Sequence, residues 1–200
     1  MLRYLSTPAF LCCDLQASFA TRLPRFQHGV FVAKRFLAFH ELFPGETSYV
    51  ATEQYPKGLG RLVPEIGIEA AQQREMGAKK IYVFEKTTFS MITPEVTAQL
   101  EGHDSIVLFG IEAHACILQT TDDLVAMGKK VYIAADGTFS QRDEDRKYAF
   151  KTMMEFGKGN VFLTTSESIL LALLRDAAHP KFKQVSALLR QQAPVIGKEK

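Results

Sequence analysis

Tryptophan is absent from this chain of 200 residues, and cysteine and histidine are scarce, with three and five copies. No stretch approaches the roughly 18 consecutive apolar residues of a membrane-spanning helix, so we expect no membrane partner. A surplus of one charge is also missing, because 24 Lys and Arg face 22 Asp and Glu. Dedicated nucleic-acid binders are usually strongly basic, so nucleic acid is not the expected partner either.

The three cysteines, Cys12, Cys13 and Cys116, form neither a disulfide framework nor a CxxC motif. We expect no secretory leader and a reducing compartment, with the cytoplasm favoured and the mitochondrion as the alternative. The histidines lack metal-ligand spacing, and the sequence contains neither GxGxxG nor GxSxG. We therefore expect no metal, no nicotinamide or flavin cofactor, and no serine-hydrolase elbow.

Six short apolar runs, rich in β-branched and aromatic residues, alternate with stretches of helical periodicity. The runs are continuously apolar, as strands buried on both faces require. This alternation predicts an α/β fold with three α/β/α layers around a six-stranded parallel sheet. The predicted strands cover residues 8–14, 47–52, 79–85, 104–110, 129–136 and 160–165, and the predicted helices cover 22–43, 65–76, 94–101, 113–127, 143–157 and 166–176.

No linker, internal repeat or low-complexity block divides the chain, so we expect a single domain over residues 1–200. Its core should run from about residue 7 to 176, with a C-terminal helix and tail over 177–200. Acidic residues at 143–145 suit the positive start of a helix. Glycines stand where the preceding helices should end, at Gly77, Gly128 and Gly157.

Reactive side chains follow three of the predicted strands. Asp14 ends the first strand, Lys86 follows the third, and Cys116 lies shortly after the fourth. Ligands of such sheets bind beyond the carboxyl ends of the strands, so we expect these residues to meet there. A nearby cation and a helix N-terminus favour a nucleophilic thiolate, whose proton Asp14 could carry. By residue type alone, a small buried cysteine, a surface lysine and a strand-ending aspartate are simpler explanations.

The segments around these residues are LCCDLQASF, EKTTFSM and LFGIEAHACILQTTDDL. They resemble the three signature segments of the isochorismatase-like hydrolases, also called the cysteine hydrolase superfamily. The matching positions are Asp14 before Leu15-Gln16, Lys86 before Phe89-Ser90, and Cys116 after Gly110-Ile111. The resemblance covers nearly the whole chain.

This resemblance implies a catalytic triad of Asp14, Lys86 and Cys116, in a homo-oligomer with a six-stranded parallel sheet. It also implies a cis peptide bond between Ile111 and Glu112. The backbone N–H groups of Glu112 and Cys116 would then form the oxyanion hole.

The string TEQYPKGLGRLVPEIG narrows the resemblance to a eukaryotic branch, isochorismatase domain-containing protein 2. Some kinetoplastid members of that branch have been labelled mitochondria-associated ribonucleases. One departure from the wider superfamily is informative: residues 53–56 read Glu-Gln-Tyr-Pro where nicotinamidases carry an Asp-x-His metal site. A zinc-assisted nicotinamidase is therefore not expected, and the retained cysteine favours amide over vinyl-ether hydrolysis.

Several residues are weaker candidates for a substrate pocket. Phe19 and Phe89 could form an apolar wall, although both also suit the hydrophobic core. Gln54 and Tyr55 could contact substrate or only shape the turn before Pro56. His114 lies two residues before Cys116, so on a helix the two side chains would diverge.

The leading hypothesis is a cysteine hydrolase that acts on a small amide-type substrate through a thioester. A second is a binding or regulatory protein on the same scaffold, with weak or no catalysis. The third is a ribonuclease, which the near-neutral charge and the lack of paired histidines disfavour.

Overall fold

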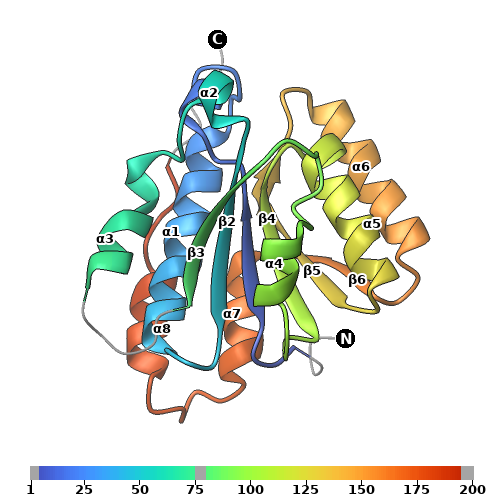
Figure 1. Cartoon of the computed structure of the whole chain (residues 1–200). Coiled ribbons are helices and arrows are strands. Elements are labelled where there is room, and N and C mark those ends of the chain that lie inside the picture. The colour runs from blue at the N-terminus through green and yellow to red at the C-terminus, as the bar shows by residue number, and fades with distance from the viewer. Residues whose placement is uncertain (1–4, 75–79, 195–200) are drawn as a thin grey trace.

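The structure is a computed structural model that describes residues 5–74 and 80–194. Its six strands form one parallel sheet in the order β3-β2-β1-β4-β5-β6 (Figure 1), so the predicted six-stranded parallel sheet is confirmed. The strands are β1 (Ala9–Cys13), β2 (Ser48–Gln54), β3 (Ile81–Lys86), β4 (Ser105–Ile111), β5 (Lys130–Phe139) and β6 (Val161–Thr164).

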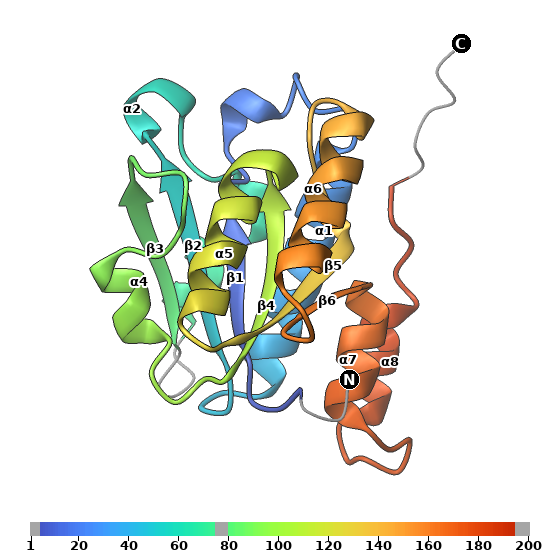
Figure 2. The same cartoon turned by 90° about the vertical axis from the view of Figure 1, so that its right-hand side faces the viewer.

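Helices cover both faces of the sheet (Figure 2). One layer contains α1 (Phe26–Leu42), α3 (Ile68–Gln73), α7 (Ser166–Leu174) and α8 (Phe182–Leu189), and the other contains α4 (Pro94–Gln99), α5 (Leu118–Ala126) and α6 (Asp143–Phe156). Successive strand residues point to opposite faces, so Cys12 packs in the first layer and Cys13 in the second. These two cores account for the continuously apolar strands.

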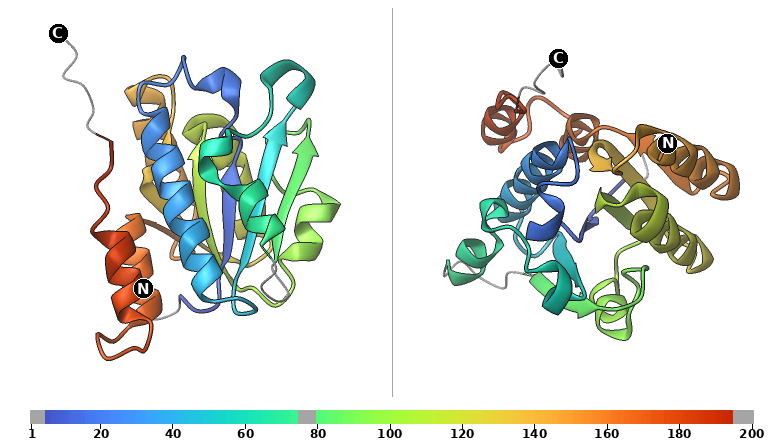
Figure 3. Two further views of the ribbon diagram at one scale, coloured as in Figure 1. Left: turned by 90° about the vertical axis from the view of Figure 1, so that its left-hand side faces the viewer. Right: turned by 90° about the horizontal axis from the view of Figure 1, so that it is seen from above.

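The strand order reverses between β1 and β4, which places the switch point of the sheet above its two central strands. The right-hand view of Figure 3 looks onto the carboxyl ends of the strands. Gly110 lets β4 approach β1 closely there, because a Cβ atom at Gly110 would lie 2.2 Å from the Cys13 carbonyl oxygen. Its φ of +118° also requires glycine.

Several element boundaries differ from the sequence prediction. The helix predicted over 65–76 divides at Gly67, whose φ is +88°, into a 3₁₀ turn (Pro64–Ile66) and α3. The strand predicted over 129–136 continues to Phe139, because its pairing with β4 shifts register beyond Leu108. Residues 75–79, which include Gly77 and the predicted start of β3, lie outside the described ranges.

Other elements follow the predicted pattern closely. The long first helix begins at Phe26 instead of residue 22, two residues after Pro24. The acidic residues at 143–145 form the first turn of α6, where the helix dipole favours them. Helix α8 occupies the C-terminal segment in which a packed helix is expected, and its Val185 is fully buried.

Candidate active site

Asp14 follows β1 at the centre of the sheet edge and is buried, with a left-handed φ of +50°. Its Oδ1 atom accepts a 2.8 Å hydrogen bond from the hydroxyl of Thr52, which lies in β2 opposite Cys13. Its Oδ2 atom accepts a 3.3 Å hydrogen bond from the Cys13 thiol and pairs with Lys86 Nζ at 2.8 Å. The carboxylate is therefore fixed from three sides.

Lys86 ends β3, and its side chain is completely buried. Besides Asp14, its Nζ atom contacts Gln54 Oε1 at 2.6 Å and Cys116 Sγ at 3.7 Å. It also donates to two backbone carbonyls, those of Thr88 and Phe89, at 3.2 and 3.0 Å. A buried ammonium group with this many acceptors is held in one position.

The electrostatic environment keeps Lys86 charged. Burial by itself lowers the pKa of Lys86, but the acidic groups of Cys13, Asp14 and Cys116 outweigh it, and the net pKa is raised. A permanently charged ammonium group beside sulfur favours the thiolate form of a cysteine.

Cys116 lies in a π-helical turn (Ala113–Ile117) that follows β4 and leads into α5. Its backbone carbonyl accepts a 2.6 Å hydrogen bond from Thr120, and the Thr120 hydroxyl accepts from the Met91 N–H at 2.9 Å. The turn is thereby tied to the loop after β3. The structure brings together the three residues on which the sequence prediction centres, as one Asp-Lys-Cys cluster of Asp14, Lys86 and Cys116.

The Ile111–Glu112 peptide bond is cis, at the bond where the family resemblance implies one. The Glu112 carbonyl accepts from the N–H groups of Ala115 and Ile117, both at 3.2 Å, which closes the turn around Cys116. The side-chain Oε1 atom of Glu112 accepts a hydrogen bond from the Gln141 N–H at 3.0 Å, so the loop after β5 supports the same turn.

Gln54 is turned into the protein instead of toward a substrate. Its Oε1 atom accepts from Lys86, and its Nε2 atom donates to the Thr87 carbonyl at 2.7 Å. The Gln16 side chain in turn holds the Gln54 backbone, donating to its carbonyl at 3.0 Å and accepting from its N–H at 2.8 Å. Gln16 and Gln54 therefore orient Lys86 through a short chain of hydrogen bonds.

The side chains of the remaining pocket candidates have different surroundings. Tyr55 and Phe89 expose more than half of their surface, at 55% and 54%, so Phe89 is not a core residue. Phe19 is partly buried and packs against the hydrophobic core of the first layer. His114 is exposed, and its Nδ1 atom hydrogen-bonds to the Ser140 hydroxyl at 3.0 Å.

Two contacts to Asp14 were not predicted from the sequence. The contact of Thr52 could have been predicted, because Thr52 is a polar residue near the carboxyl end of a strand that pairs with β1. The second contact comes from Cys13, whose thiol donates to the Asp14 carboxylate. Burial, followed by the contact with Cys116, raises the pKa of Cys13 well above its ordinary value, which keeps it a neutral donor.

Among the described residues, Cys13, Asp14 and Cys116 are close enough to share a metal ion, since their ligand atoms lie within 4.8 Å of one another. The Lys86 ammonium group, however, already pairs with the Oδ2 atom of Asp14 at 2.8 Å. A divalent cation would have to displace it, so this donor set does not fit a resident metal.

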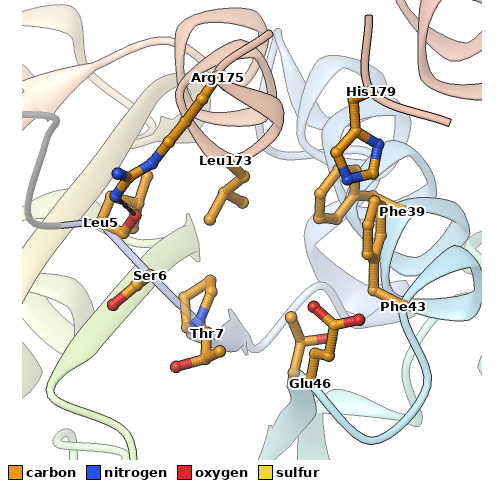
Figure 4. A pocket seen from close by; sticks show the side chains of 11 residues that line it. Leu5, Ser6, Thr7, Phe39, Phe43, Glu46, Leu173, Arg175 and His179 are labelled. Carbon is orange, nitrogen blue, oxygen red and sulfur yellow. Dashed lines mark hydrogen bonds between the residues drawn. The ribbon is translucent and has the colours of Figure 1, made fainter. Parts of the chain in front are cut away.

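Lys86 also lines a cavity of about 500 Å³ at the β3 edge, together with Tyr55, Lys57, Glu85 and Glu95. A second cavity, of about 220 Å³, lies at the opposite, amino end of β1 and β2. Figure 4 shows its aromatic side, formed by Phe39, Phe43 and His179, facing Arg175. Parallel sheets of this order bind ligands at the carboxyl ends of their strands, which favours the first cavity.

Comparison with known proteins identifies the family to which this chain belongs. Residues 8–168 match the model of the isochorismatase domain. The chain belongs to the isochorismatase-domain family. The matched range includes all six strands and the Asp-Lys-Cys cluster, and the family provides a hydrolase scaffold.

The similar curated proteins include both isochorismatase domain-containing protein 1 and isochorismatase domain-containing protein 2. The chain is 41% identical to isochorismatase domain-containing protein 2 of Xenopus laevis, covering 96% of this chain and 87% of the relative. It is 40% identical to isochorismatase domain-containing protein 1 of Salmo salar, covering 96% of this chain but only 64% of that longer relative. The predicted resemblance to the protein 2 branch is therefore confirmed, and it extends to protein 1.

Among solved structures, a candidate MAR1 ribonuclease of Leishmania major is 46% identical, with a TM-score of 0.86 and 96% of each chain covered.

Within the ranges that the structure describes, no helix is long and apolar enough to cross a membrane.

Proposed function

We propose that this protein is a cysteine hydrolase acting on a small amide-type substrate through a thioester. The observation that carries the proposal is the position of Lys86, whose Nζ atom lies 2.8 Å from Asp14 Oδ2 and 3.7 Å from Cys116 Sγ. One buried cation thus bridges a carboxylate and a thiol, the two groups that proton transfer and nucleophilic attack require.

In the proposed reaction, Asp14 takes the proton of Cys116 while Lys86 stabilises the resulting thiolate. The sulfur attacks the amide carbonyl, and the N–H groups of Glu112 and Cys116 stabilise the oxyanion. Asp14 returns its proton to the leaving amine as the C–N bond breaks. Asp14 then accepts a proton from the water that attacks the thioester and returns it to the departing Cys116 sulfur, which releases the acid and restores the free thiol.

Two features support a small amide as the substrate class and a reaction without a metal. A cavity of about 500 Å³, the size of typical small-molecule sites, adjoins Lys86, and its lining includes neither Asp14 nor Cys116. The Glu53 carboxylate is bound by Arg61 at 2.7 Å and by the Leu62 N–H at 2.8 Å. Glu53 is thus committed to the scaffold, which supports chemistry without the nicotinamidase-type metal ligands.

Turnover of a panel of small primary and secondary amides by the purified protein tests this function. We expect at least one amide to be hydrolysed, and Cys116→Ala to lower its turnover by about a thousandfold or more, because the covalent step is lost. Full turnover by Cys116→Ala would contradict the mechanism. Inactivity on the whole panel would favour the binding or regulatory alternative.

Alkylation of the cysteines by iodoacetamide gives a readout that needs no substrate. We expect Cys116 to react fast at pH 6 to 7, and Lys86→Met to slow it about tenfold by removing the cation. Lys57→Met is the matched control, because Lys57 lines the same cavity but lies outside the Asp-Lys-Cys cluster. Cys12 is the internal standard, since burial raises its pKa to about 12. Equal rates for Cys116 and Cys12 would exclude an activated nucleophile.

A second candidate, RNA cleavage, is favoured by one observation, the ribonuclease name of the Leishmania major relative. The near-neutral charge of this chain offers no general basic surplus for phosphates. Ribonuclease activity that persists through purification and disappears in Asp14→Asn would support this candidate. Activity equal in wild type and Asp14→Asn would identify a contaminant.

A further inference from the structure

The proposed hydrolytic mechanism leaves one nucleophilic group beside the site unused, the thiol of Cys13. Cys13 is the last residue of β1, is fully buried, and lies on the same face of the sheet as Cys116. Their sulfur atoms lie within 4.8 Å of each other, although the two residues come from opposite sides of the β1–β4 switch point. Gly110 permits this approach by bringing β4 against the Cys13 backbone.

We propose that Cys13 is the resolving thiol of an oxidative modification site, which forms a reversible disulfide with Cys116 when the protein meets a peroxide. The proposal rests on the proposed function in one respect, the nucleophilic character of Cys116. Closing the bond requires the sulfurs to move from within 4.8 Å to about 2.05 Å, a change on the scale of side-chain rotation.

The order of events follows from access and charge. Cys116 retains 7% of its surface exposed, whereas Cys13 retains none, so a peroxide reaches Cys116 first. Lys86 lies 3.7 Å from that sulfur and favours the reactive thiolate. Cys13 stays protonated and protected until Cys116 has been oxidised.

The chemistry is balanced by hydrogen peroxide as the oxidant. The Cys116 thiolate attacks one peroxide oxygen, which gives a sulfenic acid and hydroxide, and the hydroxide takes the proton that Asp14 received from Cys116 and leaves as water. The Cys13 sulfur then attacks the Cys116 sulfur and passes its proton to the Asp14 carboxylate, to which it already donates a hydrogen bond at 3.3 Å. Asp14 protonates the departing hydroxide, so the second step releases water and forms the disulfide.

The disulfide would switch the site off without destroying it. Cys116 can no longer attack a carbonyl while bonded to Cys13, and a dithiol reductant restores both thiols. Without a resolving thiol, the sulfenic acid proceeds to sulfinic acid, which such reductants do not reverse. Cys13 would thus protect the nucleophile as well as regulate it.

Mass spectrometry of the protein treated with hydrogen peroxide tests the proposal directly. We expect a peptide in which Cys13 is linked to Cys116, with loss of two hydrogens, and a parallel loss of iodoacetamide labelling at Cys116. Dithiothreitol should restore that labelling. Only sulfinic acid at Cys116, or a link through Cys12, would overturn the proposal.

Two variants of neighbouring residues provide a matched comparison. In Cys13→Ser we expect no link and irreversible loss of Cys116 labelling, because nothing resolves the sulfenic acid. Cys12→Ser should behave as wild type, since Cys12 packs on the opposite face of β1 under α1. Equal recovery by dithiothreitol in both variants would also overturn the proposal.

The wild-type alkylation profile separates this proposal from the hydrolase proposal. Fast alkylation of Cys116 without a link after peroxide would overturn the oxidative site alone. Slow alkylation of Cys116 together with the absence of a link would overturn both proposals.

Discussion

At the scale of single residues, the cluster depends on a buried ion pair between Asp14 and Lys86, whose side chains are 2% and 0% exposed. Removing one partner of such a pair leaves an uncompensated buried charge, which typically costs about 3–5 kcal/mol. The hydrogen bonds that Thr52 and Cys13 donate to Asp14, and the one that Lys86 donates to Gln54, reduce the desolvation cost of keeping both charges. Retaining so costly an arrangement is consistent with a chemical role.

Thr52→Val isolates one of these hydrogen bonds. Valine fills the same space but leaves Asp14 Oδ1 without its 2.8 Å donor, so the free energy of unfolding should fall by about 1.5–3 kcal/mol. Urea denaturation at pH 7 measures this loss. Thr52→Ser keeps the hydroxyl and should lose less stability; a larger loss in Thr52→Ser would show that packing of the methyl group dominates.

The sequence allowed the meeting of Asp14, Lys86 and Cys116 to be predicted, because parallel strands bring their carboxyl ends to one edge. It did not allow the inward turn of Gln54 or the contact of Cys13 with Asp14 to be predicted. Those contacts depend on side-chain rotamers and on the register between neighbouring strands, which one-dimensional patterns do not encode.

At the scale of elements, the close approach of β1 and β4 sets the spacing of the site. Cys13 pairs with Gly110, and the turn that carries Cys116 begins two residues after β4 ends at Ile111. Any side chain at Gly110 would push the strand ends apart.

Gly110→Ala should therefore lower the free energy of unfolding by about 2–5 kcal/mol, because it combines a positive φ with overpacking. Gly102→Ala is the control, since its φ is +77° but nothing lies within 4 Å of the added Cβ atom. It should cost about 1–2 kcal/mol. Thermal denaturation measures the stability of both variants. Equal losses of stability in the two variants would show that the close contact between β4 and β1 is unimportant.

Element types were predictable where periodicity was strong and boundaries were marked. The parallel strands and the acidic start of α6 are examples. The π-helical turn at Ala113–Ile117 and the extension of β5 to Phe139 were not predictable. Both arise from tertiary packing around the switch point, which overrides local propensity.

At the scale of the whole molecule, the two buried strand thiols predict a loss of stability in alkali. Burial raises the pKa of Cys12 to about 12 from an unfolded value of 9.0, and the pKa of Cys13 is also raised. Above pH 9 the unfolded chain loses these protons while the native state keeps them, so the stability is present below pH 9 and falls as pH rises toward 12. Each thiol should remove about 1.4 kcal/mol between pH 8 and 10.

Urea denaturation at pH 8, 9 and 10 measures this slope. Cys12→Ala should be less stable at pH 8 but should lose about 1.4 kcal/mol less than wild type on going to pH 10. Lys86 adds little to this slope, because its pKa is raised from 10.5 and its contribution to stability is therefore lost only as pH rises above 10.5. Parallel curves for wild type and variant would contradict the assignment of the slope to Cys12.

The position of β1 has a consequence for the newborn chain. This strand is synthesised first, yet both of its neighbours in the sheet, β2 and β4, leave the ribosome later. Asp14 emerges well before Lys86, and Cys116 emerges last of the three. A chain interrupted before β4 would therefore expose an unpaired central strand to chaperones and proteases, and it would lack Cys116.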